Sequence, residues 1–301
     1  MVVLNSLSFD IEDWFQVENL KEAISLDQWE SCELRVVQNT RKILRLLTEH
    51  QTLATFFILG WVAERCPGLI EEIAGSGHEI ASHGYGHELV YKLTPEAFYA
   101  DVRLSKDILE SITGSPVIGY RAPGFSITPK SRWAPEVVKH AGFRYDSSIF
   151  PTSFHNRYGF NGTCRLPFQF RNGLAEIPLS IYSFAGANFP LAGGGYFRLF
   201  PYSYFQLFFR RMNKQGKPIV FYLHPWELDP EQPRIKVRLN YRLRHYVNLE
   251  KTENRLEKLL KDFRFVPLKV LVDHYFPSAQ YNPQVASREG ARGSRPVTRN
   301  A

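Results

Sequence analysis

Cysteine is scarce in this sequence. Cys32, Cys66 and Cys164 are its only cysteines, and no two of them are spaced as a Cys-x-x-Cys pair. An odd number of cysteines without that spacing argues against a framework of disulfide bonds. We therefore expect reduced, buried thiols.

Long apolar runs are missing as well. No segment approaches the roughly 20 apolar residues of a membrane span. The first residues, Met-Val-Val-Leu-Asn-Ser, carry no basic region followed by a long apolar core, as a secretory signal would. We therefore expect a soluble, cytoplasmic protein without a transmembrane segment, and peripheral contact with a membrane-linked glycan stays open. The sequence gives no indication of the oligomeric state.

Acidic residues are fewer than basic ones. The 30 Asp and Glu residues face 37 Lys and Arg residues, which gives a formal net charge of +7. Much of the excess lies in residues 234–269 and after residue 286. Because no basic helix is interleaved with base-stacking aromatic residues, the excess favours a solvated basic face over nucleic-acid binding.

Apolar residues, by contrast, are plentiful: 44% of the 301 residues are hydrophobic and 14% are aromatic. A chain of this composition can bury the core of a single domain. Short apolar runs predict buried strands at residues 2–9, 53–59, 77–81, 117–120, 143–145, 218–223 and 265–268. Helical spacing and end signals predict helices at residues 36–47, 67–73, 95–112, 135–140, 201–212 and 242–263.

Repeated strand-then-helix units predict an α/β fold with a parallel sheet or barrel. The alternation breaks between residues 150 and 200, where Phe, Tyr, Gly and Pro are frequent and Gly193, Gly194 and Gly195 follow one another. We expect an elaborated insertion of loops and short strands there, within a single domain over residues 1–277. Residues 278–301 are polar and lack periodicity, which predicts a disordered tail.

Reactive side chains recur directly after the predicted strands: Asp10, His83, Arg121, Asp146 and His224. In barrels the functional site lies at the C-terminal ends of the strands. Each residue alone has an ordinary structural explanation, such as a cap, an ion pair or an Asx-turn. Their shared position at five separate strand ends favours one common site.

The pair His83 and His87 can present two imidazoles to one metal ion. Gly84 and Gly86 between them favour a tight loop over a helical turn. A carboxylate from the end of the first strand can complete the set, and Glu12 and Asp13 are both candidates.

A metal held by two histidines and one carboxylate keeps open positions for water and substrate. Asp10, held by Arg121, can act as the base that takes a proton from water. His224, oriented by Asp146, can protonate the leaving group. The sequence thus predicts metal-assisted hydrolysis of an amide or an ester.

These residues carry a resemblance to the polysaccharide deacetylase superfamily, the NodB-homology carbohydrate esterases. The family's first motif, Thr-Phe-Asp-Asp-Gly, is matched loosely by Ser8-Phe9-Asp10-Ile11-Glu12-Asp13, and its second, His-Ser/Thr-x-x-His, by His83-Gly84-Tyr85-Gly86-His87. Arg121-Ala122-Pro123-Gly124 is similar to the third motif, Asp146 stands for the fourth, and Leu223-His224 matches the fifth.

The resemblance implies a distorted (β/α)7-type barrel and a divalent metal, with zinc as the first choice. Relatives that use Asp-x-Asp in the first motif favour Glu12 as the ligand, and Asp13 stays an alternative. The substrate would be an N-acetylated glycan, and the following aromatic residues are expected to bind it: Trp14, Tyr85, Tyr120, Tyr145 and Trp226.

A closer resemblance concerns a subgroup linked to bacterial exopolysaccharide loci with PEP-CTERM/exosortase systems. Residues 9–17 and the run Gly193-Gly194-Gly195-Tyr196-Phe197-Arg198 resemble its signatures. This implies removal of N-acetyl groups from a polysaccharide or lipid-linked glycan. Ile11 and Gly124 depart from the family pattern, and the Trp that follows the fourth-motif Asp is absent. These departures concern substrate scope more than chemistry.

Two other functions compete. A cyclic-amide hydrolase of the allantoinase-like branch shares the pattern His-Gly-Tyr-x-His-Glu, and a non-catalytic carbohydrate-binding protein could keep the same fold. The aromatic residues between 150 and 200 favour a sugar-binding groove over the first alternative. The intact set of Asp10, His83, His87, Arg121 and His224 argues against the second.

Overall fold

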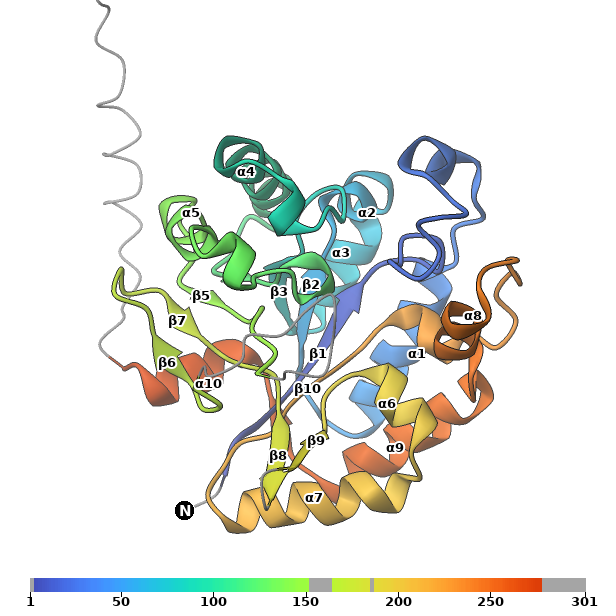
Figure 1. Cartoon of the computed structure of the whole chain (residues 1–301), viewed down its shortest axis with the longest axis vertical. Coiled ribbons are helices and arrows are strands. Elements are labelled where there is room, and N and C mark those ends of the chain that lie inside the picture. Colours follow the sequence, from blue (N-terminus) through green and yellow to red (C-terminus); the bar gives the residue numbers. More distant parts are fainter. Residues whose placement is uncertain (1–2, 152–163, 185–186, 278–301) are drawn as a thin grey trace, which may run out of the picture.

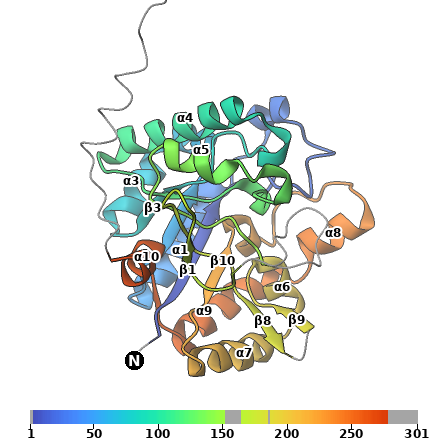
Figure 2. The ribbon, with the colours of Figure 1, turned by 60° about the vertical axis from the view of Figure 1, so that its left-hand side comes forward.

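The chain folds around one curled sheet of mostly parallel strands, with helices packed around it (Figures 1 and 2). The computed structural model describes residues 3–151, 164–184 and 187–277. Within these residues eight of the nine strands of this sheet follow the order β10-β1-β2-β3-β4-β5-β7-β6, and the ninth, β11, pairs with β1. The expected α/β, barrel-like fold is confirmed. The tail expected at residues 278–301 lies outside the described residues.

The strands have the bounds β1 (Asn5–Ile11), β2 (Thr55–Ile58), β3 (Glu79–Ser82), β4 (Gly119–Tyr120), β5 (Tyr145–Asp146), β6 (Phe168–Gln169), β7 (Ala175–Glu176), β8 (Ile181–Phe184), β9 (Ala187–Pro190), β10 (Val220–Leu223) and β11 (Phe265–Val266). All neighbours in the large sheet are parallel except β6 and β7, and β8 and β9 form a separate antiparallel pair. Parallel pairing brings the C-terminal ends of β10, β1, β2, β3 and β4 to one edge of the sheet.

The helices are α1 (Val36–Glu49), α2 (Gly60–Arg65), α3 (Pro67–Gly75), α4 (Pro95–Thr113), α5 (Ala134–His140), α6 (Gly194–Leu199), α7 (Tyr202–Lys214), α8 (Leu239–Tyr246), α9 (Thr252–Asp262) and α10 (Leu268–Tyr275). The longest, α4, begins as its sequence predicts: Thr94 caps it by accepting a hydrogen bond from the N–H of Ala97, and Pro95 is its first residue. None of the helices in the described residues is long and apolar enough to span a membrane.

Three expectations from the sequence are wrong in detail. The single helix expected over residues 242–263 is divided into α8, a short 3-10 turn and α9. The glycine run at residues 193–195 leads into α6, where a loop was expected. The three cysteines are free, as expected, but Cys32 and Cys66 are only half-buried and Cys164 is exposed.

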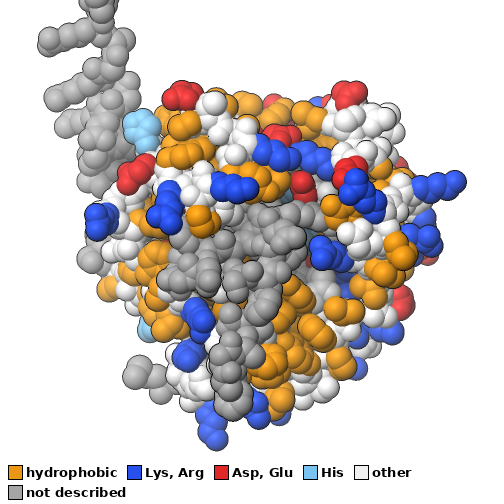
Figure 3. Space-filling model, in the orientation of Figure 1, with side chains coloured by type: hydrophobic (Ala, Val, Ile, Leu, Met, Phe, Trp, Pro, Cys, Tyr) orange, Lys and Arg blue, Asp and Glu red, His pale blue; other side chains and the backbone are white. Residues whose placement is uncertain are grey.

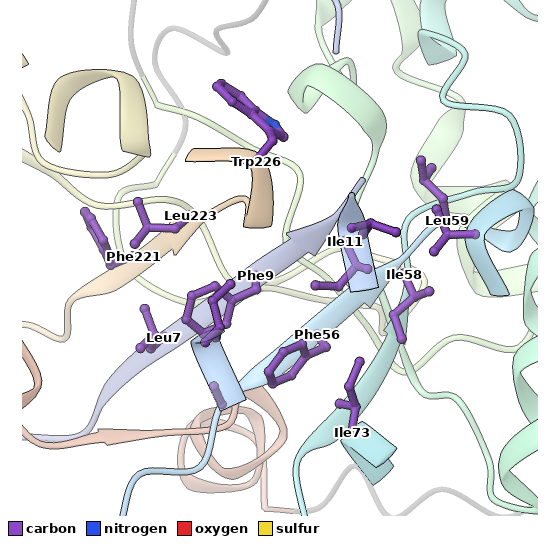
Figure 4. Close-up of a cluster of buried hydrophobic side chains, with 14 of the residues drawn as sticks. Leu7, Phe9, Ile11, Phe56, Ile58, Leu59, Ile73, Phe221, Leu223 and Trp226 are labelled. Carbon is purple, nitrogen blue, oxygen red and sulfur yellow. The ribbon is translucent and has the colours of Figure 1, made fainter. Parts of the chain in front are cut away.

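The central strand β1 is fully buried and separates two environments. Its odd-numbered residues Leu7, Phe9 and Ile11 pack into the main hydrophobic core with Phe56 and other residues of the neighbouring elements (Figure 4). Side chains alternate between the two faces of a strand. The polar residues between them therefore face the inside of the curled sheet, which is where the candidate site lies.

The far ends of the sheet approach each other. Ser180, which follows β7, donates its backbone N–H to the carbonyl of Val220 in β10, and the Val220 N–H donates to the Ser180 hydroxyl. The sheet order itself starts at β10, so this contact bends the sheet toward closure. The strand ends are thereby grouped around one hollow.

Candidate metal centre and catalytic site

Three buried side chains at the strand ends present metal-ligating atoms to one point. Glu12 follows β1, and His83 and His87 follow β3; one ligand atom from each lies within 4.8 Å of the others. Nε2 of His87 is 2.8 Å from Oε2 of Glu12. Nδ1 of His83 is 2.8 Å from the carbonyl oxygen of Arg121, which leaves Nε2 directed at the group. Two imidazoles and one carboxylate are a donor set that suits zinc and similar divalent ions.

The two histidines are carried by a loop that Asp101 of α4 holds in place. The Asp101 carboxylate accepts hydrogen bonds from the N–H groups of Tyr85 and Gly86. Gly84 has a positive φ of 74°, and a Cβ there would lie 2.7 Å from Oδ2 of Asp101. The connection is a tight loop, as the glycines predicted, although His87 and not Gly86 takes the second positive φ.

Asp10 and Arg121 form a buried ion pair at the base of the site. Nη1 of Arg121 donates to Oδ1 of Asp10 at 2.6 Å and to the Ser8 hydroxyl at 2.8 Å. Its Nε and Nη2 bond to the carbonyl and hydroxyl of Ser147, and the guanidinium lies 4.0 Å from the centre of the Phe57 ring. Arg121 has no freedom to move, so the position of the Asp10 carboxylate is fixed.

His224 faces these carboxylates from the end of β10. Its Nε2 lies 3.1 Å from Oε1 of Glu12 and 4.0 Å from Oδ2 of Asp10. Its Nδ1 lies 2.9 Å from Oε2 of Glu227, which also accepts the His224 backbone N–H. Oε1 of Glu227 in turn accepts from Nε of the buried Arg198 at 3.0 Å. The imidazole is therefore fixed through Glu227 and Arg198.

Asp146, the residue predicted to orient His224, does not do so. Its carboxylate accepts a hydrogen bond from the Ser148 hydroxyl and lies beside Glu176 of the neighbouring strand β7. Asp146 ends β5, and β1 to β4 lie between β5 and β10 in the sheet. Glu227, three residues after His224, supplies the carboxylate that orients the His224 ring instead. The sequence contains it in the run His224-Pro225-Trp226-Glu227.

Asp13, the alternative metal ligand, lies outside the metal-ligating group. Its two carboxylate oxygens accept hydrogen bonds from the N–H groups of Trp14, Arg35 and Val36. Two of these donors stand at the start of α1, so Asp13 satisfies backbone groups that a helix terminus leaves without partners. The structure favours Glu12 as the carboxylate ligand.

The site lies in a cavity of about 690 Å³. Besides Asp10, Glu12, His83, His87 and His224, its lining includes the following apolar and aromatic residues: Val17, Leu89, Phe125, Tyr196, Leu199, Tyr222, Trp226, Leu243 and Val247. Of the aromatic residues expected to bind substrate, Trp226 lines this cavity and stacks on His224 with ring centres 5.3 Å apart.

The other four expected aromatic residues serve the scaffold. Tyr120 and Tyr145 are wholly buried, and the Tyr145 hydroxyl donates to Glu79. Trp14 is buried and donates its indole N–H to the Glu33 carbonyl, while the Tyr85 hydroxyl donates to Glu64. None of the four lines this cavity, which therefore gives their predicted role in substrate binding no support. The aromatic wall comes instead from residues whose position in sequence gives no sign of it.

The glycine run explains how Glu227 reaches His224. A Cβ on Gly194 would lie 1.9 Å from the Glu227 carboxylate, a distance at which no side chain fits. A Cβ on Gly193, whose φ is +97°, would lie 2.7 Å from the Tyr222 hydroxyl. The run therefore lets α6 approach Glu227 closely, and the same helix carries Arg198 to the other carboxylate oxygen.

Burial and charge set the protonation states. Burial raises the pKa of Glu12, but the positive charges of His87 and His224 outweigh it and lower this pKa to about 2. Burial lowers the pKa of His83 to about 4. Burial also acts to lower the pKa of His224, but Glu12 and Glu227 oppose it and raise the value to about 9. At neutral pH the site therefore holds an anionic Glu12, a neutral His83 and a protonated His224.

Two family models match successive parts of the chain. Residues 23–145 match the model described as "Polysaccharide deacetylase", and residues 147–273 match a domain of unknown function, DUF3473. Residues 23–145, which we call the deacetylase segment, are thus similar to the polysaccharide deacetylase family. This deacetylase segment contains His83, His87 and Arg121, while the second segment contains His224, Glu227 and Arg198. The candidate site is assembled from both segments and from Asp10 and Glu12, which precede them in the sequence.

Curated proteins that are similar to this chain are named as deacetylases too. Peptidoglycan-N-acetylglucosamine deacetylase of Bacillus cereus is 34% identical over 98 residues, which are 32% of this chain and 36% of that protein. The chain spans less than two fifths of the length of that protein and of the peptidoglycan deacetylase of Helicobacter pylori, which is 28% identical over 117 residues.

Solved structures share the fold over nearly the whole chain. A presumed polysaccharide deacetylase of Mycobacterium smegmatis has a TM-score of 0.59 and 19% identity, covering 99% of this chain and 94% of that one. The PuuE allantoinase has a TM-score of 0.59 and 17% identity, covering 93% and 92%. At these identities the likeness shows the fold alone.

Proposed function

We propose that the chain is a metal-dependent deacetylase that removes N-acetyl groups from a glycan. The observation that carries the proposal is the placement of Glu12, His83 and His87 beside two further groups, the Asp10–Arg121 pair and the His224–Glu227 pair. The first offers a metal site, the second a base and the third an acid. The deacetylase family model and the named relatives point to the same reaction.

The residues present fit a divalent ion. Oε2 of Glu12 is buried and has the His87 imidazole beside it, yet it accepts no well-aligned hydrogen bond from the described residues. Oε2 of Glu12 and Nε2 of His87 therefore lie close together without a well-aligned hydrogen bond, as two ligands of one metal ion would. When bound, zinc or a similar ion would polarise the amide carbonyl and activate a water molecule.

The remaining chemistry belongs to the chain's own groups. Asp10, fixed by Arg121, accepts the proton of the attacking water. His224 carries a proton on Nε2, while Nδ1 donates its proton to Glu227. As the amide C–N bond breaks, the Nε2 proton passes to the nitrogen of the departing sugar amine.

The choice of a glycan rests on the cavity. Phe125, Tyr196, Tyr222 and Trp226 line it, and aromatic faces stack on sugar rings. The signature-like runs at residues 9–17 and 193–198 both reach this site, because the first contains Asp10 and Glu12 and the second ends at Arg198. We infer a polysaccharide or lipid-linked glycan of exopolysaccharide or envelope biosynthesis as the substrate. An allantoinase-like cyclic amide is the second candidate, because that fold is equally similar.

The test combines metal analysis with acetate release. His87→Ala should lower bound zinc from about one equivalent per chain to a small fraction of it, and activity should fall with it. Asp10→Asn should keep the metal but lower kcat by about 10²- to 10⁴-fold. Acetate release from N-acetylated oligosaccharides, with allantoin as the competing substrate, identifies the reaction.

Asp13→Asn is the matched control for the ligand assignment. Its carboxylate bonds to backbone N–H groups, so the variant should keep its metal while Glu12→Gln loses it. A fully active wild-type protein without stoichiometric metal would contradict the proposal. So would turnover of allantoin without release of acetate from any glycan.

A further inference from the structure

The α8 face combines exposed leucines with basic residues. We define the α8 face as Leu199 at the end of α6, Leu239 and Leu243 on α8, and the exposed basic side chains of residues 234–244. Leu239, Leu243 and Leu199 are exposed to 69%, 59% and 58%, the highest values for large hydrophobic residues in the described part of the chain. Monomeric proteins rarely gather such residues without a partner.

The charge of this face has one sign. Residues 232–249 contain Arg234, Lys236, Arg238, Arg242 and Arg244 and neither Asp nor Glu. All five basic side chains are exposed. Arg238 pairs with Glu22, whereas Lys236, Arg242 and Arg244 form no ion pair with a carboxylate of the described residues. Figure 3 shows hydrophobic and basic side chains next to each other at the right-hand edge, where Figure 1 places α8.

The arrangement along α8 is that of a surface-binding helix. Leu239, Arg242 and Leu243 stand at positions i, i+3 and i+4 and therefore share one side of the helix. His245, on the same helix, is fully buried. A helix with leucines on its exposed side and arginines beside them suits the boundary between lipid headgroups and acyl chains.

The buried side of α8 is bonded to the catalytic site. Arg198 donates hydrogen bonds to the carbonyl oxygens of Arg244, His245 and Val247. The His245 ring stacks on Trp226 with ring centres 4.3 Å apart. Leu199, Leu243, Arg244 and Val247 also line the cavity. A surface that binds the α8 face would therefore lie beside the entrance to the cavity.

We propose that the α8 face docks the protein on the surface of an anionic lipid bilayer. Charge complementarity selects this partner, because the exposed Arg and Lys side chains attract acidic headgroups and Lys236, Arg242 and Arg244 are not paired with a carboxylate of the described residues. The leucines then bury their side chains below the headgroups. Docking brings the cavity to the membrane surface, where a lipid-linked glycan would present its sugar.

Vesicle co-sedimentation tests the docking with the full chain. Wild-type protein should bind vesicles that contain phosphatidylglycerol, bind neutral phosphatidylcholine vesicles much less, and dissociate at high salt. Lys236→Gln with Arg242→Gln should weaken binding by about 25-fold, since each charge contributes about fivefold. Leu239→Ser should weaken it by about fivefold or more.

Helix α7 offers matched controls. It carries exposed Leu207, Arg210 and Lys214 but lies away from α8 in both ribbon views (Figures 1 and 2). Leu207→Ser, and Arg210→Gln with Lys214→Gln, should leave vesicle binding within about twofold of wild type. Equal losses in the α7 and α8 variants, or wild-type binding in the α8 variants, would overturn the proposal. Failure of the wild-type protein to bind anionic vesicles would do so as well.

The outcome is independent of the proposed chemistry. Lys236, Leu239 and Arg242 do not line the cavity. Their variants should therefore deacetylate a short soluble oligosaccharide at the wild-type rate. Loss of vesicle binding with that activity retained supports docking, whereas a protein that binds vesicles but deacetylates nothing would count against the proposed function alone.

Discussion

At the scale of single residues, the environment of His224 differs at its two ring nitrogens. Nδ1 meets Glu227, and Nε2 points toward Glu12 and Asp10. The Glu227 charge helps to raise the pKa of His224 to about 9. A raised histidine pKa keeps the ring protonated up to that pH, so the acid form is lost only in the alkaline range.

Replacing Glu227 should change the pH profile of catalysis. In Glu227→Gln the imidazolium loses a supporting charge, so the alkaline limb of kcat/KM should move to lower pH by about 1–2 units. Asp146→Asn is the control, because Asp146 contacts Ser148 and Glu176 instead of His224. Rates measured from pH 6 to 10 with both variants decide the matter. A shift in Asp146→Asn with none in Glu227→Gln would reverse our assignment.

The sequence predicted part of this residue-level arrangement. Asp10, Arg121 and His224 could be placed at strand ends because an apolar run precedes each of them. The partner of His224 could not be predicted, since Glu227 follows it in a 3-10 turn whose geometry no periodicity shows. The role of Arg198 could be predicted still less, because it depends on the packing of α6 against Glu227, which brings Arg198 to that carboxylate.

At the scale of elements, the neighbouring strands β5 and β7 place two carboxyl groups together. Asp146 and Glu176 are in register and wholly buried. Burial raises the pKa of Asp146 to about 6, and burial together with the Asp146 charge raises the pKa of Glu176 well above its usual value. The folded protein therefore keeps a proton that the unfolded chain releases above pH about 4.

This pair should make stability fall as the pH rises. Between pH 5 and 8 the unfolded chain binds fewer protons at these groups than the folded one, so the free energy of unfolding decreases. Glu176→Gln carries the neutral form at every pH and should gain about 1–3 kcal/mol at pH 8. Melting temperatures across this range test it, with Glu71→Gln at an exposed position as the control. Parallel profiles of wild type and Glu176→Gln would refute the explanation.

The break between α8 and α9 shows why the hydrophobic periodicity wrongly predicted a single helix over residues 242–263. Residues 242–263 have helical spacing, but the Arg198 side chain binds the carbonyls of Arg244, His245 and Val247. Asn248 then adopts a left-handed φ of 50° and donates its side-chain amide to the Arg198 carbonyl. A contact between segments about 50 residues apart thus ends the helix. Local sequence patterns cannot predict a contact between segments so far apart in the chain.

At the scale of the whole molecule, the two matched segments share one sheet. β1 pairs with β10 on one side and with both β11 and β2 on the other, because Ser6 lies between Val220 of β10 and Val266 of β11. The deacetylase segment supplies β2, β3 and β4, and the DUF3473 segment supplies β10 and β11. Alternating strands and helices predicted this sheet, but they could not show that β1 would join the two segments.

The side chain of Asn5 ties β1 to the DUF3473 segment. The side-chain amides of Asn5 and Asn213 form two hydrogen bonds. Asn5 donates to Oδ1 of Asn213 at 3.0 Å and accepts from Nδ2 of Asn213 at 2.7 Å. It also accepts the Ile219 N–H at 2.9 Å and donates to the Arg264 carbonyl at 3.3 Å. One buried amide thus links β1 to α7 and to the chain leading into β10 and β11.

If the two segments form one cooperative unit, Asn5→Ala should shift the whole unfolding transition. Removing the amide leaves buried partners without hydrogen bonds, which should cost about 2–4 kcal/mol. Calorimetry should show a single transition that moves to lower temperature by about 2–4 °C for each kcal/mol lost. The exposed Gln38→Ala on α1 should change stability by less than about 0.5 kcal/mol. A second, early transition in Asn5→Ala, with the rest of the protein melting as before, would show instead that the segments unfold independently and that the single-domain prediction is wrong.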